Sequence, residues 1–219
     1  AFSRAKNRAT SMKKVKKDNP VEKLKRTSVE KINVIKQVIS EDMRKIISSY
    51  PNIDNLPEFY VELVKNSLEY EYLKKSLGAV NWSAGKVKDF SLLYTKKIKG
   101  STNKDEIQKH MKSYYGRISS TLKRIDKHLK YLEEARKTMK SFPSVKTSLP
   151  TVAIFGFPNI GKTTLLSKLT DSDPEINSYS FTTKKINIGY MKKDNPKIQI
   201  LDTPGALDRL DKMNDIEKQ

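Results

Sequence analysis

The stretch that decides the class of fold runs Gly156-Phe157-Pro158-Asn159-Ile160-Gly161-Lys162-Thr163. It matches the pattern GxxxxGK[ST] at every fixed position, between an apolar run at 151–155 and a helical pattern at 162–169. Glycines let a backbone wrap closely around phosphates, and the turn directs several N–H groups inward. A glycine turn with an incidental lysine is the plainer interpretation, and the flanking signals disfavour it. The sequence therefore predicts a phosphate-binding loop in which Lys162 reaches the β- and γ-phosphates and the Thr163 hydroxyl binds Mg²⁺.

A second short motif, Asp202-Thr203-Pro204-Gly205, directly follows an apolar run at 198–201. A carboxylate at the end of a strand can hold the water shell of Mg²⁺, and the Gly205 amide can meet a γ-phosphate. Alone, such a motif is also a common turn. After a phosphate-binding loop it favours a GTPase over most P-loop ATPases and kinases, and a P-loop ATPase stays the alternative.

Between the two motifs lies Tyr179-Ser180-Phe181-Thr182-Thr183-Lys184. We interpret Thr183 as a residue that closes onto Mg²⁺ when the γ-phosphate is present, so that loss of this phosphate releases the loop. An ordinary polar loop around a buried aromatic is the alternative. Strand patterns at 185–191 and 197–201, joined by a turn at 193–196, complete the opening of an α/β nucleotide-binding domain.

The 219-residue chain carries 44 Lys and Arg residues against 25 Asp and Glu residues, a formal charge of +19. Residues 1–150 hold 34 of the basic and 16 of the acidic residues. Because cations that meet phosphates release counterions, this excess favours RNA or DNA as a partner, with a solvated surface and an anionic membrane as alternatives. The chain has no Cys, which excludes a disulfide framework. No run approaches the about 20 apolar residues of a membrane span.

The region before the phosphate-binding motif has the pattern of a helical protein. Residues 1–27 are rich in Lys and poor in large apolar side chains, and we interpret them as a basic arm that orders on binding. After a predicted cap at Ser28, apolar residues recur at three- and four-residue steps. Breaks at 51–57, near Gly78 and at Gly100 divide the rest of this region into further helices.

A helix predicted from Asp105 to about Ser141 carries a heptad seam of apolar residues. The members of this seam are Met111, Tyr115, Ile118, Leu122, Ile125, Leu129, Leu132 and Met139. Such a seam can form a dimeric coiled coil, but the neighbouring amphipathic helices favour an antiparallel bundle over 28–142. The stretch 143–150 is bounded by prolines and is predicted to be a linker.

Some side chains of the helical region could serve other roles. His110 and His128 have no carboxylate or histidine partner at metal-ligand spacing, so we expect them on the surface or facing RNA. Trp82, Tyr114 and Tyr115 could stack on bases. Packing in the core is the favoured interpretation, because Tyr115 lies on the predicted seam.

Taken together, the motifs resemble a known family. Gly-x-Pro-Asn-x-Gly-Lys-Thr, Tyr-x-Phe-Thr-Thr-Lys and Asp-Thr-Pro-Gly are similar to the motifs of Obg-type translation-factor GTPases. Residues 50–54, 57–60 and 131–136 (Tyr-Pro-Asn-Ile-Asp, Pro-Glu-Phe-Tyr and Tyr-Leu-Glu-Glu-Ala-Arg) resemble segments of the nucleolar GTP-binding protein 1 family. The resemblance covers essentially the whole chain, and the abundance of Lys and Ile is more like an archaeal homologue.

The resemblance implies a factor that assembles the large ribosomal subunit, binds pre-ribosomal RNA and exchanges GTP for GDP. It implies partners among ribosomal proteins and other assembly factors of the pre-ribosomal particle, no membrane, and a monomer off the ribosome. The location would be cytoplasmic in an archaeon and nucleolar in a eukaryote.

Functional residues carry over from the family by position. Thr163 and Thr183 would touch Mg²⁺, Asp202 would act on it through a water, and Asn159 would bind K⁺ beside the phosphates. The catalytic set would be Lys162, Thr183 and Gly205. The residues that line the nucleotide would be Phe157, Pro158, Asn159, Ile160, Gly161, Lys162, Thr163, Thr164 and Gly205.

Two features depart from the family pattern. Ala206 follows Gly205, where signalling GTPases place a glutamine that orients the attacking water, so intrinsic hydrolysis should be slow. The Asn-Lys-x-Asp segment that reads guanine is expected beyond Gln219. We therefore expect a chain truncated within its GTPase domain, whose guanine specificity rests on the resemblance.

The predicted fold class is α + α/β, with an antiparallel helical bundle followed by the first half of a P-loop GTPase domain. The predicted parts are a basic arm (1–27), an RNA-binding bundle (28–142), a linker (143–150) and the GTPase part (151–219). A different class of function also stays open, namely a non-catalytic basic RNA-binding scaffold with an inert, truncated nucleotide site.

Overall fold

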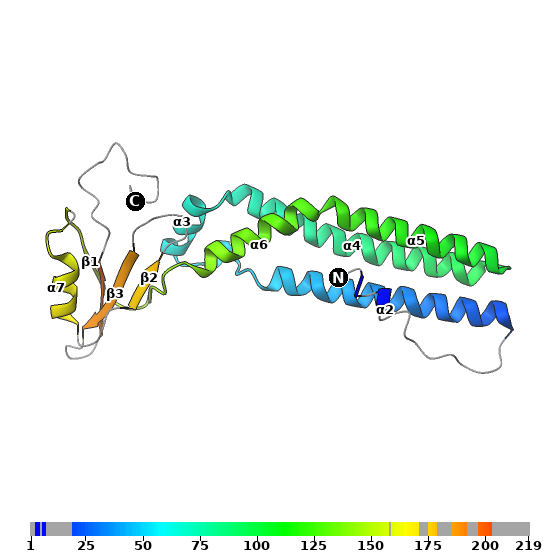
Figure 1. The fold of residues 1–219 in the computed structure, drawn as a ribbon, viewed down its shortest axis with the longest axis horizontal. Coiled ribbons are helices and arrows are strands. Elements are labelled where there is room, and N and C mark those ends of the chain that lie inside the picture. Colours follow the sequence, from blue (N-terminus) through cyan, green and yellow to red (C-terminus); the bar gives the residue numbers. More distant parts are fainter. Residues whose placement is uncertain are drawn as a thin grey trace. The chain divides into compact units, whose positions relative to one another are not determined.

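The computed structural model describes residues 3–4, 6–7, 19–157, 159–170, 175–178, 185–191 and 197–202. Long helices come first and a small sheet follows, which confirms the α + α/β class (Figure 1). The chain divides into two compact units, one of residues 1–51 and 72–132 and one of residues 52–71 and 133–219. None of the helices in the described ranges is long and apolar enough to cross a membrane.

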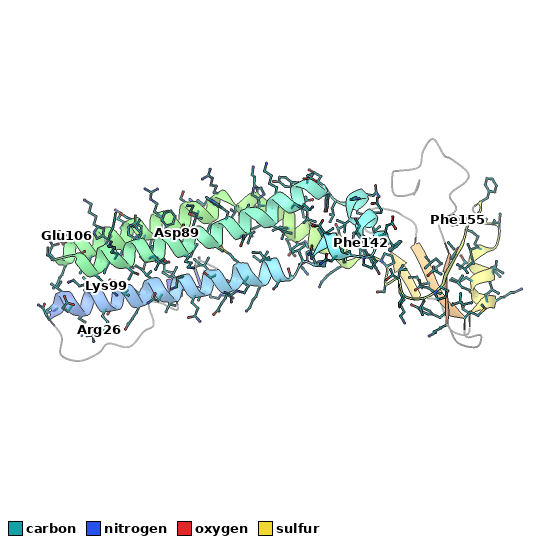
Figure 2. The ribbon with its side chains drawn as sticks, turned by 180° about the vertical axis from the view of Figure 1, so that it is seen from behind. Arg26, Asp89, Lys99, Glu106, Phe142 and Phe155 are labelled. Atoms are coloured by element: carbon teal, nitrogen blue, oxygen red, sulfur yellow. The ribbon has the colours of Figure 1, made fainter. Side chains whose placement is uncertain are left out.

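The first unit holds helices α2 (Pro20–Ser48), α5 (Lys104–Arg124) and most of α4 (Tyr70–Gly100), which run side by side (Figures 1 and 2). On each helix the buried positions recur three and four residues apart, so each contributes one apolar stripe. The fully buried aliphatic residues include Ile32, Ile35, Ile39, Leu73, Val80, Val87, Ile98, Ile107 and Ile118. The antiparallel bundle predicted from the sequence is confirmed.

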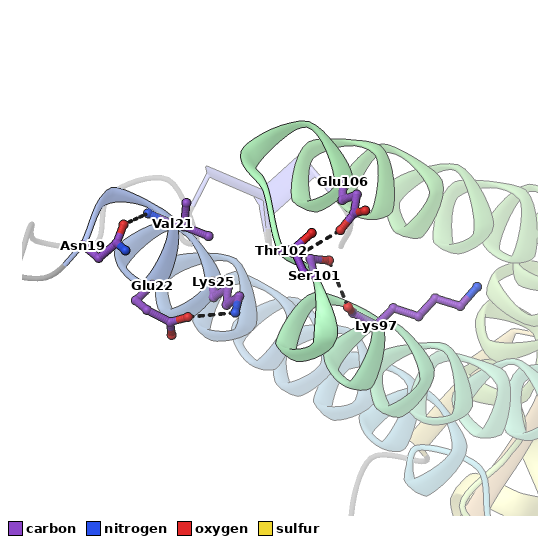
Figure 3. Close-up of polar contacts among 8 residues, drawn as sticks. All are labelled: Asn19, Val21, Glu22, Lys25, Lys97, Ser101, Thr102 and Glu106. Atoms are coloured by element: carbon purple, nitrogen blue, oxygen red, sulfur yellow. Dashed lines mark hydrogen bonds and ion pairs between the residues drawn. The ribbon is translucent and has the colours of Figure 1, made fainter.

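Helix α2 begins earlier than the sequence predicted. The Asn19 side chain accepts a hydrogen bond from the Val21 N–H at 3.1 Å, and Pro20 occupies the first helical position (Figure 3). Both features favour a helix start, because the cap satisfies a free N–H and proline lacks one. The predicted cap at Ser28 is therefore wrong, and Ser28 is a buried residue inside the helix.

The turn between α4 and α5 is closed by a reciprocal cap. The Asn103 side chain accepts from the Glu106 N–H at 2.9 Å. The Glu106 carboxylate in turn accepts from the Thr102 N–H at 2.9 Å, as Figure 3 shows. The Ser101 hydroxyl donates to the Lys97 carbonyl at 3.0 Å. These bonds satisfy groups that a helix end leaves unpaired, so the hairpin of α4 and α5 has a defined corner.

The predicted helix break near Gly78 is wrong. Helix α4 runs through Gly78, and the break falls at Leu68, which is extended, after α3 (Glu58–Ser67). A glycine inside a helix costs about 1 kcal/mol relative to alanine. That cost is small beside the burial of Leu73 and Val80, which flank Gly78 on the same helix and are both fully buried.

The long helix predicted from Asp105 to Ser141 is two helices, α5 and α6 (Asp126–Lys140). They meet at Ile125, whose backbone (φ −98°, ψ 3°) interrupts the helix while its side chain stays buried. Half of the predicted seam is confirmed, because Met111, Ile118, Ile125 and Leu132 are buried, but the positions between them differ from the predicted ones. Its buried members are Ile107, Met111, Tyr114, Ile118, Thr121, Ile125, His128, Leu132, Ala135 and Thr138. Tyr115, Leu122, Leu129 and Met139 are only partly buried.

His128 is part of the bundle core, so its predicted surface location is wrong. It is 7% exposed, its ring packs 5.4 Å from that of Tyr72, and its Nδ1 lies 3.0 Å from the Ser76 hydroxyl. A buried polar ring is tolerated because it has a hydrogen-bond partner. The preference for core packing is confirmed for Tyr114, which is fully buried, and is wrong for Trp82, which is 41% exposed.

The second unit contains a sheet of β1 (Thr151–Ile154), β2 (Glu175–Ser178), β3 (Lys185–Met191) and β4 (Ile198–Asp202) in the order β1-β4-β3-β2. β1 pairs with β4 in parallel, and the other pairs are antiparallel. Helix α7 (Lys162–Leu169) buries Leu166 against the sheet, and a Cβ on Gly189 of β3 would come within 3.0 Å of that leucine. The predicted elements at 162–169 and 185–191 are confirmed, and the strand predicted at 197–201 is found one residue later, at Ile198–Asp202. Strand β2 was not predicted, and the predicted turn at 193–196 lies outside the described residues.

Strand β1 was predicted to be buried, and on this point the prediction is wrong. Val152 is 52% exposed and the following Phe155 is 65% exposed (Figure 2). In the described part of the chain, β1 pairs only with β4, and α7 packs on β3 and β4. The apolar run at 151–155 therefore predicted the strand correctly but not the exposure of its side chains to solvent.

The segment 143–150 forms no helix or strand but is tied to its neighbours within the second unit. The Tyr60 hydroxyl of α3 bonds the carbonyls of Pro143 and Val145 at 2.9 and 3.0 Å. The Lys146 N–H donates to the side chain of Gln199 at 2.9 Å, and Gln199 is fully buried in β4. Its role as a linker stays a prediction.

Candidate phosphate-binding site

The phosphate-binding motif forms a loop from Gly156 to Gly161 between β1 and α7. Asn159 has a φ of 62° and Gly161 a φ of 89°, so both have a left-handed backbone. Glycine adopts this conformation freely, and asparagine adopts it more readily than most residues. Gly161 is the N-cap of α7, and its carbonyl accepts from the Leu165 N–H at 2.8 Å. A Cβ on Gly156 would lie 2.3 Å from Cδ1 of Ile160. The left-handed backbone at Gly161 thus favours glycine, and a side chain at position 156 would have to displace the end of the Ile160 side chain.

Lys162 lies in the first turn of α7 and is only 9% exposed. Its ammonium donates to the carbonyls of Gly156 at 3.1 Å and Phe157 at 2.8 Å. The first turn of α7 carries no acidic residue, so the positive end of the helix dipole acts with the lysine charge. A phosphate oxygen, being charged, forms stronger bonds to an ammonium than a carbonyl does. This arrangement can therefore bind a polyphosphate.

Asp202, at the end of β4, connects the loop to the sheet. It is 4% exposed, and its Oδ2 accepts from the Thr163 hydroxyl at 2.6 Å and from Asn187 Nδ2 at 3.0 Å. Asn187 stands opposite Asp202 in the antiparallel pairing of β3 with β4. Three side chains from α7, β3 and β4 therefore converge on one point beside the loop.

The geometry of Asp202 fits a hard cation. Its Oδ1 is buried and has no hydrogen-bond partner among the described residues, which is costly for a carboxylate oxygen unless a cation or donor compensates. Carboxylate and hydroxyl oxygens suit Mg²⁺, which usually keeps several waters and shares phosphate oxygens. Thr163 and Asp202 are the protein groups that would hold it. In the described ranges no three His, Cys, Asp or Glu residues form a metal cluster by themselves.

The structure describes most of the residues predicted to line the nucleotide and places them around one loop. Phe157 and Ile160 are 51% and 59% exposed, and Thr164 is exposed in the first turn of α7. Pro158, Thr183 and Gly205 lie outside the described residues, so their roles stay predictions. The sequence did not predict a role for Asn187. Only the pairing of β3 with β4 brings Asn187 next to Asp202, and no local motif encodes that pairing.

The helices of the first unit carry the surplus positive charge. Arg26, Asp89, Lys99 and Glu106 illustrate how charged side chains leave the helices toward solvent (Figure 2). Ion pairs form along single helices, such as Lys25 with Glu22 at 2.7 Å (Figure 3). Because residues 1–150 hold roughly two basic residues for each acidic one, many cations remain to attract a polyanion.

Comparison with known proteins finds two family matches along the chain. Residues 1–146 match the NOG1 N-terminal helical domain, and residues 151–219 match the 50S ribosome-binding GTPase family. An uncharacterized protein of Methanocaldococcus jannaschii is 42% identical over 190 residues, which cover 86% of this chain and 53% of that protein.

The eukaryotic relatives are longer. Nucleolar GTP-binding protein 1 of Drosophila melanogaster is 29% identical over 206 residues, covering 94% of this chain and 32% of that protein. The protein of the same name from Saccharomyces cerevisiae is 31% identical over 180 residues, covering 82% and 28%. The chain thus spans about half the length of the first relative and about a third of these two.

Proposed function

Because this chain belongs to the nucleolar GTP-binding protein 1 family, we propose that it binds GTP at the loop around Lys162 and acts in assembly of the large ribosomal subunit. The observation that carries the proposal is the convergence of Lys162, Thr163 and Asp202 at the start of α7. Family membership supports the guanine nucleotide, since the domain at 151–219 is that of a ribosome-binding GTPase.

Different residues at the loop contact the phosphates and the Mg²⁺ of the bound nucleotide. Lys162 exchanges its two carbonyl acceptors for the β- and γ-phosphates, and the N–H groups at the start of α7 bind the same oxygens. Bound Mg²⁺, held through Thr163 and the water shell at Asp202, would neutralise charge on the phosphates. The reaction is in-line attack of water on the γ-phosphate, with Lys162 stabilising the charge that develops.

Hydrolysis in this protein is slow without help. Ala206 stands where a water-orienting glutamine would be needed, and an alanine cannot orient water. Asn159, which has a left-handed backbone within the loop, is proposed to bind K⁺ beside the phosphates. A K⁺ ion or a ribosomal partner then completes the site.

The nucleotide governs binding to pre-ribosomal RNA. GTP orders the loop around Thr183, with the Gly205 amide on the γ-phosphate, and hydrolysis releases it. The basic arm and bundle hold the RNA through phosphate contacts, together with ribosomal proteins or other assembly factors of the particle. The protein is a monomer off the ribosome and works in the cytoplasm of an archaeon or the nucleolus of a eukaryote.

A titration with a fluorescent GTP analogue, with and without Mg²⁺, tests the nucleotide site in this chain and in the longest natural chain that contains it. Binding should require Lys162, so Lys162→Ala should abolish it. The matched control is Lys168→Ala, which removes an exposed cation from the last turn of the same helix and should bind normally. Competition by ATP as strong as by GTP would indicate a P-loop ATPase. If neither chain binds GTP, the alternative function of a non-catalytic basic RNA-binding scaffold would be favoured.

Binding of ribosomal RNA at several salt concentrations tests the electrostatic part. Affinity should fall steeply with salt, and removal of residues 1–18 should flatten the dependence, since that segment holds seven basic residues and ends before Asn19 caps α2. Lys162→Ala should leave the RNA affinity nearly intact. A flat salt response, or collapse of RNA binding in Lys162→Ala, would contradict the proposed division of labour.

A further inference from the structure

One face of α4 carries an exposed tryptophan between two glycines. Trp82 is 41% exposed, although tryptophan is usually well covered. Gly78 lies four residues before it and Gly85 three residues after it, which are positions that neighbour Trp82 along a helix. A Cβ on either glycine would meet nothing within 4 Å. The indole therefore stands on open surface, and neither of these two neighbouring positions carries a side chain.

Packing does not account for these glycines. Glycine is among the poorest helix formers, and a glycine inside a packed element usually admits a close neighbour, as Gly189 does for Leu166 in the sheet. No such neighbour approaches Gly78 or Gly85 among the described residues. Without side chains at these two positions, the surface beside the indole is left open, as a second planar group requires.

A cation lies over the indole, and two others lie nearby in the sequence, on α4 and α6. The Arg124 guanidinium carbon, at the end of α5, lies 5.3 Å from the centroid of the Trp82 ring. Lys75 lies two turns before Trp82 on α4, and Lys127 lies in the first turn of α6. Burial lowers the pKa of His128, and the charges of Lys127 and Lys75 lower it further. The acid next to this group, Asp126, is held by Lys130 at 2.8 Å.

We propose that Trp82 and Arg124 form a stacking site for an unpaired base of the RNA that the bundle binds. The site, called here the Trp82 patch, consists of Lys75, Gly78, Trp82, Gly85, Arg124 and Lys127. It rests on the proposed function, because it places on the bundle one contact of the RNA partner.

The chemistry of the patch selects an unpaired base over other ligands. An indole offers its π face to any base that is not already stacked in a duplex, and a guanidinium stacks on bases and also pairs with phosphate. Lys75 and Lys127 add charge for the phosphates on either side. An apolar protein partner would instead favour the part of α4 that exposes Leu92 and Leu93, at 61% and 45%, where no aromatic is exposed.

Trp82 is the one tryptophan of the chain, so its fluorescence reports on this site alone. The test titrates the 219-residue chain with a 12-nucleotide single-stranded RNA and with a duplex of equal length, following Trp82 emission and the anisotropy of a labelled RNA together. We expect the single strand to quench the emission with the same midpoint as the anisotropy. The duplex should quench much less at equal occupancy.

Variants separate stacking from charge. Trp82→Ala should weaken single-strand binding by roughly 5- to 150-fold with an unchanged salt slope, because base stacking is not ionic. Arg124→Gln should lower the slope by about 0.7, the value for one phosphate on a single strand. Trp82→Phe should keep most of the affinity, and Leu93→Ala, a control on the same helix, should keep all of it. Circular dichroism checks that each variant is folded.

The outcomes that overturn the proposal differ from those that overturn RNA binding itself. RNA binding with unchanged Trp82 emission, or a loss in Leu93→Ala equal to that in Trp82→Ala, overturns the stacking site and leaves the proposed function standing. Equal quenching by the duplex overturns the preference for an unpaired base. No anisotropy change at low salt overturns RNA binding and the stacking site together.

Discussion

The helical bundle and the phosphate-binding loop bury polar groups in opposite ways. In the bundle, the Ser91 hydroxyl donates to the Val87 carbonyl at 2.7 Å and lies 3.1 Å from the Tyr114 hydroxyl, and Ser76 bonds His128. These partners are side chains and carbonyls of the helices themselves. The bonds satisfy groups that packing has buried, and nothing in them invites a ligand.

At the loop, the buried polar groups have partners that can be exchanged or are missing. Lys162 holds two neutral carbonyls, and Asp202 leaves Oδ1 without a partner in the described part of the chain. The bundle has one such atom too, the Ser83 hydroxyl, but a neutral hydroxyl costs far less to bury than a carboxylate oxygen. The difference shows that a buried charge with incomplete bonding identifies the functional site better than burial alone.

The largest effect should come from the bundle core. Ile118→Ala removes a fully buried side chain of α5, and such a change lowers the free energy of unfolding by about 2–5 kcal/mol. Denaturant unfolding followed by circular dichroism measures this. Leu92→Ala, at a position 61% exposed on α4, is the control and should change the free energy by less than about 0.5 kcal/mol. Equal costs at the two positions would show that the bundle core is not packed as described.

The next effect should separate stability from function at Asp202. Asp202→Asn removes the negative charge of the carboxylate whose Oδ1 has no partner among the described residues. The amide oxygen of the asparagine can still accept from Thr163 and Asn187. We expect unfolding stability to be unchanged or higher, because the charge of this buried carboxylate no longer has to be desolvated. The gain in GTP affinity that Mg²⁺ brings should fall about tenfold, which corresponds to about 1.4 kcal/mol.

Two measurements decide this prediction, namely thermal unfolding without nucleotide and GTP titration across Mg²⁺ concentrations. Asn187→Ala is the companion variant, since it removes a donor to Asp202 but keeps the carboxylate. It should retain the Mg²⁺ dependence better than Asp202→Asn does. If Asp202→Asn is strongly destabilised but its GTP affinity still depends on Mg²⁺ as in the parent chain, Asp202 has a structural role, like the buried polar residues of the bundle.

The sequence predicts the loop better than it predicts the bundle, and the reason is physical. The phosphate-binding motif is local, so Gly156, Gly161 and Lys162 indicate both their backbone and their chemistry, and α7 begins and ends where predicted. The pairing of Asn187 with Asp202 depends on strand register, which no short segment encodes.

In the bundle, hydrophobicity alone predicted half of the seam correctly and the alternate positions wrongly. Tyr114 and His128 are buried where the larger apolar pattern favoured Tyr115 and Leu129. Small or polar residues can occupy seam positions when the facing helix supplies a partner, as Ser76 does for His128. That partner is a property of the packed structure, so the sequence predicted the buried aliphatic positions of the bundle but not its buried polar ones.

A smaller effect should come from one bundle hydrogen bond. The Ser91 hydroxyl already donates to the Val87 carbonyl, so the Tyr114 hydroxyl is the donor between Tyr114 and Ser91. Tyr114→Phe removes this bond but leaves the donor of Ser91 satisfied, and should lower the free energy of unfolding by about 1 kcal/mol. Urea unfolding at neutral pH measures this cost. A cost above about 3 kcal/mol would mean that the hydroxyl supports more than this one bond.

The same residue predicts the behaviour of the bundle at alkaline pH. Burial raises the pKa of Tyr114 to about 12, whereas a tyrosine in the unfolded chain ionises near about pH 10. The unfolded state therefore loses this proton first, and stability falls as pH rises from about 10 to 12. In Tyr114→Phe this part of the fall should disappear, which pH-dependent thermal unfolding measures against the parent chain.

The smallest effect should be the acid response of His128. Burial lowers the pKa of His128, and the charges of Lys127 and Lys75 lower it further. Below about pH 6.5 the unfolded chain binds a proton at this histidine while the folded bundle does not. The contribution of His128 to stability is therefore fully present above about pH 6.5 and is lost as pH falls toward the lowered value. Thermal unfolding between about pH 7.5 and 5 should show the loss.

Two variants assign this acid response to His128. His128→Gln keeps a polar side chain beside Ser76 but does not titrate, so the decline over the same pH range should be reduced. His110→Gln, the matched control on α5 outside the buried seam, should decline as the parent chain does. The bond to Arg136 lowers the pKa of Glu133, so this carboxylate takes up a proton only in solutions more acid than the measured pH range. Glu133 therefore does not contribute to the decline measured here. If His128→Gln and the parent chain decline equally, the histidine is not buried in its neutral form, and the contrast between the closed bonding of the bundle and the open bonding of the loop is weaker than the structure indicates.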